Sequence, residues 1–132
     1  MYHGWNDQGV APGNRVNYYE SVVGVLGAKP VDGFLRLFMA PGMQHCRGGP
    51  IPAAGPDTFD EVGALEQWVE QDHAPEKIIA SHSKGGVVDR TRPLCPYPQV
   101  ARYTGTGSTD DAANFACGTP GPVTSRPGPG AR

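Results

Sequence analysis

The sequence contains one β–α–β crossover, and this pattern limits what the chain can fold into. Apolar residues recur at helical spacing between Asn14 and Gly27, and the apolar run from Gly33 to Met39 fits a strand buried on both faces of a parallel sheet. Only two residues precede His3-Gly4, where the first strand should end. Because a single crossover cannot form a stable sheet by itself, we expect neighbouring strands from outside the chain. The 132 residues are therefore interpreted as part of a larger α/β domain.

A second helix is predicted after a Gly/Pro-rich loop at residues 47–56. The first helix should end at Gly27, with Pro30 shortly after it. Its apolar stripe consists of Val16, Tyr19, Val22, Val23 and Leu26. Thr58 and Glu61 have the spacing of a capping box at the start of the second helix. The apolar face of that helix, with its tryptophan in the core, consists of Phe59, Val62, Leu65, Trp68 and Val69.

The rest of the chain predicts less regular structure. Residues 78–81 and 87–91 fit two strands joined by a turn at residues 84–86. Residues 93–117 lack long periodicity, apart from a short helical turn expected within Asp110–Phe115. Residues 119–132 are rich in proline and glycine, which predicts a disordered tail.

Charge and composition exclude several classes of protein. The net charge is −2, so the chain has no electrostatic footprint of a nucleic-acid-binding protein. It has no apolar run of about 18 residues that would span a membrane, and its first residues lack the pattern of a signal peptide. Three cysteines are present, and an odd count in an oxidised protein leaves one thiol seeking a partner outside the chain.

Two residues with catalytic chemistry follow the two strands of the crossover. Asp7 comes after the first strand end and His45 after the Phe34–Met39 strand. In open α/β sheets functional groups gather outside the carboxyl ends of the strands, and an acid followed by a histidine matches the end of the α/β-hydrolase order Ser…Asp…His. Each residue alone has a simpler interpretation: Asp7 could bond to its own loop, and His45 could merely be exposed. Together they favour an acid–base pair in which Asp7 orients the imidazole.

None of the serines fits the nucleophile of such a triad. They are Ser21, Ser81, Ser83, Ser108 and Ser125. No serine lies in a Gly-x-Ser-x-Gly turn between a strand and a helix, and all of them follow Asp7, which is the wrong order for this fold. We interpret all five as structural, and the sequence therefore predicts a nucleophile outside these residues.

Four segments carry a resemblance to a known family. They are His3-Gly-Trp-Asn-Asp, Phe38-Met-Ala-Pro-Gly-Met-Gln-His-Cys46 with Gly48-Gly49-Pro50, Arg92-Pro-Leu-Cys-Pro-Tyr-Pro98 and Gly107-Ser-Thr-Asp-Asp-Ala-Ala-Asn-Phe-Ala-Cys117. In this order they resemble the C-terminal part of the tannase/feruloyl esterase family. Its members are serine carboxylesterases with an α/β-hydrolase core and an inserted lid, and they act on small-molecule esters of aromatic acids such as feruloyl, galloyl or terephthalate esters.

The resemblance implies a fold and a domain organisation. Residues 1–118 would be the C-terminal part of the catalytic domain: a strand end, helix, strand and helix of an α/β-hydrolase core, followed by a small β-hairpin and a disulfide-tied irregular segment. Residues 119–132 would be the tail. The chain would need the N-terminal part of a secreted or periplasmic esterase, and alone it should be inactive. The alternative is a non-catalytic interaction or structural module derived from that esterase.

The resemblance also implies a role for each candidate residue and cysteine. Asp7 corresponds to the family's catalytic acid and His45 to its base. Cys46 corresponds to a cysteine that forms a disulfide with the residue before the nucleophilic serine, so its partner would lie outside this chain. Cys95 and Cys117 are then expected to pair with each other. The alternative, a zinc site, is disfavoured because they lie in no Cys-x-x-Cys motif. Family members bind calcium in the lid domain. Because this chain lacks the lid, no cofactor is expected within its residues.

Several other residues are assigned packing or ion-pair roles. Arg90 and Arg92 could bind an anionic group, but pairing with Asp110 or Asp111 is the favoured interpretation. Trp5 could line an acyl pocket, although packing under its loop is favoured. Met39 and Met43 are expected to pack around the strand end.

Overall fold

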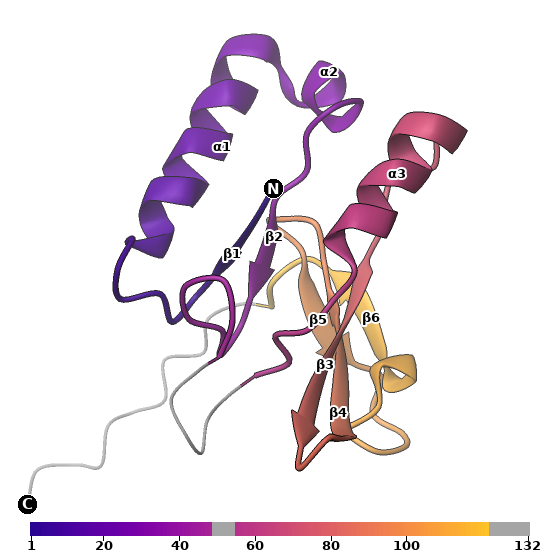
Figure 1. Ribbon diagram of the computed structural model, residues 1–132. Helices are drawn as coiled ribbons and strands as arrows, with labels where there is room; N and C mark the ends of the chain where they lie inside the picture. The colour runs from indigo at the N-terminus through magenta and orange to yellow at the C-terminus, as the bar shows by residue number, and fades with distance from the viewer. Residues whose placement is uncertain (49–54, 122–132) are drawn as a thin grey trace, which may run out of the picture.

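The computed structural model describes residues 1–48 and 55–121, shown in Figure 1. The elements in chain order are β1 (Tyr2–Gly4), α1 (Pro12–Leu26), α2 (Ala28–Asp32), β2 (Phe38–Ala40), α3 (Glu61–Gln71), β3 (Ile78–Lys84), β4 (Val87–Leu94), β5 (Val100–Tyr103), a 3-10 turn (Ala112–Asn114) and β6 (Phe115–Gly118). Within the described residues the strands form two-stranded sheets: β1–β2, β3–β4 and β5–β6. The predicted tail at 119–132 lies almost wholly outside the described residues, as does the centre of the 47–56 loop.

The predicted crossover is present. β1 and β2 pair in parallel, with Tyr2 opposite Phe38 and Gly4 opposite Ala40, and α1 connects them. All three residues of β2 are buried, as expected for a strand covered on both faces. The crossover brings the carboxyl ends of β1 and β2 to the same edge, where the loops that carry Asp7 and His45 begin.

The second strand of the crossover is shorter than predicted. It begins at Phe38 rather than near Gly33, because the backbone N–H groups of Gly33 and Leu35 donate to Pro30 and Val31 of α2. They are therefore unavailable to a sheet ladder, and Phe34 is exposed. The sequence did not predict α2, since Pro30 was expected only to follow a helix. In α2 the proline lies in the first turn, where its missing N–H costs no intrahelical hydrogen bond.

The N-cap of helix α3 lies two residues after Thr58, the predicted cap. This N-cap is Asp60, whose carboxylate accepts a 2.8 Å hydrogen bond from the Gly63 N–H. Thr58 instead exchanges backbone hydrogen bonds with Ser81 of β3, so the capping-box prediction was wrong. Trp68 is half-buried beneath the guanidinium of Arg36, 5.4 Å away, rather than in the core.

The core lies where β2 and its following loop meet the β3–β4 hairpin. It contains Phe38, Ala40, Met43, Ala80 and Leu94. The predicted packing role of Met39 and Met43 is confirmed by their burial. The apolar stripes of α1 and α3 are much more exposed than this core. Large side chains of these stripes, namely Leu26, Val62, Leu65 and Val69, are more than half exposed, which is the expected result for a crossover without further sheet neighbours.

A disulfide ties the C-terminal hairpins together. β3 and β4 form the predicted antiparallel hairpin, and Gly85 and Gly86 take positive φ angles in its turn. The segment expected to be irregular contains a second antiparallel hairpin, β5–β6, with the predicted helical turn just before β6. Cys95 and Cys117 form the predicted disulfide, with their Cα atoms 5.5 Å apart.

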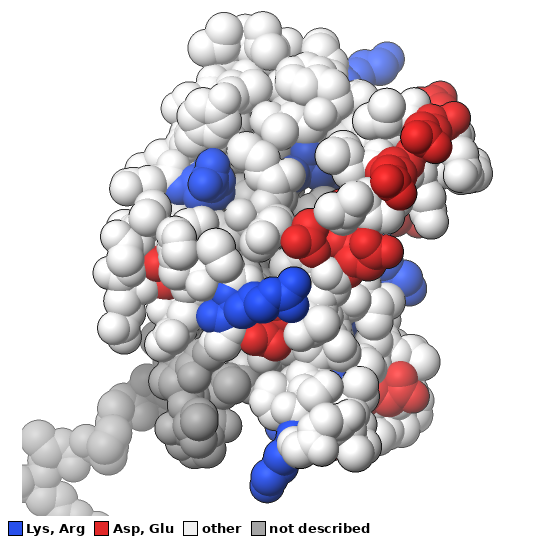
Figure 2. Space-filling view, in the orientation of Figure 1, with Lys and Arg blue, Asp and Glu red and all other residues white. Residues whose placement is uncertain are grey.

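Charges are dispersed over the face shown in Figure 2. Lys and Arg side chains are scattered on it, whereas acidic side chains gather over α3. This face therefore offers no continuous basic surface to a polyanion. In the part of the chain that the structure describes, no helix has both the length and the apolarity needed to cross a bilayer.

Candidate active site

The loops that follow β1 and β2 are held together by backbone hydrogen bonds. The Trp5 N–H donates to the Ala40 carbonyl at 3.0 Å, and the Asn6 N–H donates to the Met43 carbonyl at 3.0 Å. These bonds continue the contact between the two strands beyond their ends. They place Asp7 and His45, which are 38 positions apart in the sequence, beside one another.

Asp7 is buried, and both of its carboxylate oxygens accept hydrogen bonds. Oδ1 accepts from the backbone N–H groups of Gly9 and Val10, at 2.8 and 2.9 Å. Oδ2 lies 2.7 Å from Nδ1 of His45. The two interpretations of Asp7 that the sequence left open are therefore both present: the carboxylate holds its own loop and also contacts the histidine.

These contacts favour the ionised carboxylate. The Val10 N–H contributes most, followed by the His45 side chain and the Gly9 N–H, and together they outweigh the cost of burial. They lower the pKa of Asp7 from 3.8 to about 2. Asp7 is consequently a permanent anion at neutral pH, as required of a residue that stabilises an imidazolium.

Acidification should reveal this contribution to stability. The pKa of Asp7 is lower in the folded chain, so its carboxylate stabilises the fold fully above the unfolded value, and the contribution is lost between about pH 4 and about pH 2. We expect the stability difference between the wild type and Asp7→Asn to shrink over this range in denaturant unfolding experiments. A difference that stays constant with pH would show that the ionised form is not the one favoured.

His45 is anchored through one ring nitrogen. Its side chain remains 62 % exposed while Nδ1 contacts Asp7, so Nε2 is the nitrogen available to another group. The imidazole lines a cavity of about 360 Å³ together with His3, Asp7, Val10 and Cys46. A neutral imidazole held in this way donates from Nδ1 and can accept a proton at Nε2.

A second histidine, which the sequence pattern did not predict, contacts the same carboxylate. His3 is buried, and its Nε2 lies 3.1 Å from both Asp7 Oδ2 and the Val10 carbonyl oxygen. Both neighbours are acceptors, so Nε2 carries the proton. Its signal in the sequence is its position four residues before Asp7.

Gly4 makes the approach of the two loops possible. A Cβ atom at this position would lie 2.2 Å from the Met43 carbonyl oxygen and 2.4 Å from that of Gln44, both of them backbone atoms. Any side chain at Gly4 would therefore push the loop that carries His45 away from Asp7.

We expect Gly4→Ala to destabilise the chain by about 1–3 kcal/mol, because the backbone must shift to accept the methyl group. The variant should also weaken the contact between His45 and Asp7, which the NMR signal of the His45 Nδ1 proton would report. The matched control is Gly24→Ala on α1, where a Cβ meets no atom within 4 Å. That substitution should be neutral or stabilise by up to about 1 kcal/mol. Equal effects of the two substitutions would contradict the close approach described at Gly4.

Cys46 follows His45 as an exposed free thiol with a φ angle of +65°. Cys95 and Cys117 are bonded to each other, so neither of them pairs with Cys46. Among the described serines, the hydroxyls of Ser21 and Ser81 donate to nearby backbone carbonyls. The described lining of the His45 cavity contains no serine, and Ser125 lies outside the described residues.

The predicted roles of Arg90 and Arg92 are confirmed for only one of the two arginines. Arg90 pairs with Asp110 as predicted, with Nε 3.0 Å from Oδ1. Arg92 contacts no carboxylate among the described residues and donates instead to the Thr109 carbonyl. Trp5 is 46 % exposed and borders a cavity beside Met39. Residues 1–48 and 55–121 contain no group of three or more His, Cys, Asp or Glu side chains arranged to hold a metal ion.

The fold of this chain matches part of solved esterase structures. Feruloyl esterase B from Aspergillus oryzae matches 88 % of the chain with a TM-score of 0.74 and 32 % identity, and the match covers 25 % of that protein. The described fold is therefore a mixed α/β fragment that matches part of an esterase structure.

Comparisons with known sequences also point to esterases. A family model described as tannase and feruloyl esterase matches residues 1–118, and the chain belongs to this family. A mono(2-hydroxyethyl) terephthalate hydrolase from Piscinibacter sakaiensis is 46 % identical over 91 % of the chain and 19 % of its own length. A probable feruloyl esterase from Arthroderma benhamiae is 37 % identical over 88 % of the chain and 22 % of its own length. The chain thus spans about a fifth to a quarter of the relatives it matches.

Proposed function

We propose that the chain is the C-terminal part of the α/β-hydrolase core of a serine esterase, in which Asp7 and His45 are two members of a Ser-His-Asp triad. The observation that carries this proposal is the 2.7 Å contact between His45 Nδ1 and Asp7 Oδ2 at the carboxyl edge of two parallel strands. The serine, the oxyanion hole and the lid would lie in a part of the enzyme beyond these residues. Residues 1–118 would belong to the catalytic domain, and 119–132 would be a tail.

The geometry supports ester hydrolysis in two acyl-transfer steps. Nε2 of His45 would take the proton of the serine hydroxyl as its oxygen attacks the ester carbonyl, and the Asp7 carboxylate would stabilise the resulting imidazolium. That proton would then pass to the oxygen of the departing alcohol. In the second step, water would give its proton to His45 and attack the acyl-enzyme, and the proton would return to the serine oxygen as the acid leaves.

The relatives support an aromatic ester as the substrate. They include a probable feruloyl esterase and a mono(2-hydroxyethyl) terephthalate hydrolase, and both names refer to esters of aromatic acids. Cys46 would form a disulfide with a cysteine beside the serine and so tie the nucleophile loop to the histidine loop. The proposed chemistry needs no cofactor in this chain, and we propose a secreted or periplasmic parent enzyme because its disulfides require an oxidising compartment.

The first test is an activity measurement on the 132-residue chain. We expect no hydrolysis of feruloyl or galloyl esters by the chain alone, and activity when the remaining part of the esterase is supplied. Hydrolysis by the chain alone that a serine-directed inhibitor abolishes would contradict the proposed division of the triad. If the completed protein folds but stays inactive, the chain is instead a non-catalytic module derived from the family.

A further inference from the structure

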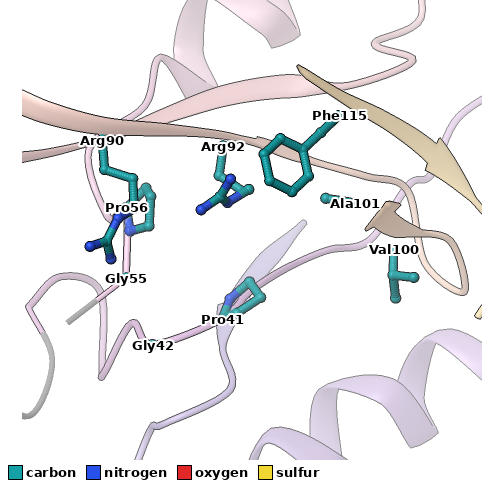
Figure 3. Close-up of a pocket in the computed structure, with 9 residues that line it drawn as sticks. All are labelled: Pro41, Gly42, Gly55, Pro56, Arg90, Arg92, Val100, Ala101 and Phe115. Carbon is teal, nitrogen blue, oxygen red and sulfur yellow. The ribbon is translucent and has the colours of Figure 1, made fainter. Parts of the chain in front are cut away.

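A second cavity, distinct from the one that His45 lines, contains two arginines. It has a volume of about 460 Å³ and shares no lining residue with the Asp7–His45 cavity. Arg90 and Arg92 of β4 lie on one side of it, and an apolar wall consists of Pro41, Pro56, Val100 and Phe115. Figure 3 shows both guanidinium groups extending from β4 into the same space, toward the segments that contain Pro41 and Pro56.

The geometry of the strand places the two arginine side chains on the same face of β4. Residues two positions apart on a β-strand project from the same face, so Arg90 and Arg92 are side by side on β4. Phe115 of β6 holds the second guanidinium in place, since its ring centre lies 3.9 Å from Cζ of Arg92. The cavity therefore presents two planar cations, of which Arg92 is held by Phe115 and Arg90 by its contact with Asp110.

The charge of this pair is only half neutralised by the described residues. Arg90 Nε contacts Asp110 Oδ1 at 3.0 Å, whereas Arg92 donates to the neutral carbonyl of Thr109. Burial lowers the pKa of Arg92 and the neighbouring Arg90 lowers it further, while the Asp110 carboxylate partly offsets both effects. Each guanidinium has five N–H donors and makes one side-chain hydrogen bond to the described residues, so donors remain for an anion.

We propose that this cavity binds an aromatic carboxylate, with its carboxylate on Arg90 and Arg92 and its ring against the apolar wall. A guanidinium matches a carboxylate through two parallel hydrogen bonds, and a planar ring suits a wall built from proline, valine and phenylalanine. The binding site goes beyond the proposed function and does not require it. If the proposed function holds, the acid released from an aromatic ester belongs to the same ligand class, and the site would bind that product.

Benzoate is the probe, and benzamide is its neutral counterpart. We expect saturable binding of benzoate by calorimetry, with NMR shifts at Phe115 and at the arginine side chains, and much weaker binding of benzamide. Arg90→Gln and Arg92→Gln should each weaken benzoate binding by about tenfold, the loss expected for one charge-assisted contact. Arg102→Gln is the matched control, because Arg102 lies on the neighbouring strand β5 and does not line the cavity.

Several results would overturn the site. Equal binding of benzoate and benzamide would remove the role of the charge, and an equal loss in the Arg102 variant would make the effect one of net charge. Shifts confined to His3 and His45 would place the probe in the other cavity. If Arg92→Gln does not fold, Arg92→Lys replaces it, because it keeps the charge without the planar guanidinium and should also weaken benzoate binding. Arg90→Gln is then the second, independent test of the site. Benzoate binding is measured without turnover, so failure of the catalytic proposal and failure of this site can be distinguished.

Discussion

Replacing His45 by alanine should abolish hydrolysis in an esterase that contains these residues together with its serine. We expect kcat/KM to fall by about 10⁴-fold or more, because the serine loses its general base and the leaving alcohol loses its acid. The fall should be in kcat with little change in KM, since the imidazole acts on the reacting atoms rather than on the aromatic group. The measurement is steady-state hydrolysis of a feruloyl ester, with folding checked by circular dichroism.

The chain offers a matched control for this substitution. His82 forms a second histidine–aspartate pair, with Nδ1 2.5 Å from Asp89 Oδ1, on the exposed β3–β4 hairpin. This contact has the same chemistry but lies away from the carboxyl edge of β1 and β2. His82→Ala should therefore retain nearly full activity. Comparable losses in both variants would show that the effect arises from general destabilisation and would remove the assigned role of His45.

Removing the Cys95–Cys117 disulfide should give the largest loss of stability. The bond closes a loop with a sequence separation of 22, which corresponds to about 3 kcal/mol in the chain-entropy model. The double variant Cys95→Ala/Cys117→Ala should lose this amount in denaturant unfolding, because the four-residue strands β5 and β6 bury few side chains of their own. Cys46→Ala is the control and should change the unfolding free energy little, since its thiol is exposed and unbonded. A double variant as stable as that control would contradict the assigned role of the disulfide.

The sequence predicted those parts of the fold that depend on local pattern. The α1 stripe, the Gly85-Gly86 turn and the crossover all follow from spacing and backbone preference within a few residues. Asp7 and His45 could be placed together from the rule that parallel strands end at one edge. The structure brings them into contact, while their catalytic role stays a prediction.

The errors arose where tertiary contacts decide the outcome. The start of β2 depends on which N–H groups α2 uses, and a single sequence does not show this competition. Thr58 was displaced from its predicted cap by pairing with Ser81, which lies 23 positions away. The β5–β6 hairpin has strands of four residues without clear alternation, so only the disulfide signalled that the segment was ordered. His3 needed the folded loop to reveal its shared contact with Asp7.

We propose His45 as the general base of a triad that is completed from outside these residues. The most direct measurement is a crystal structure of the longer esterase after its serine has reacted with an organophosphorus inhibitor. We predict that His45 Nε2 lies about 3 Å from the oxygen of the modified serine, with Nδ1 still on Asp7. A different histidine at the modified serine, or a His45 ring turned away from it, would contradict the account.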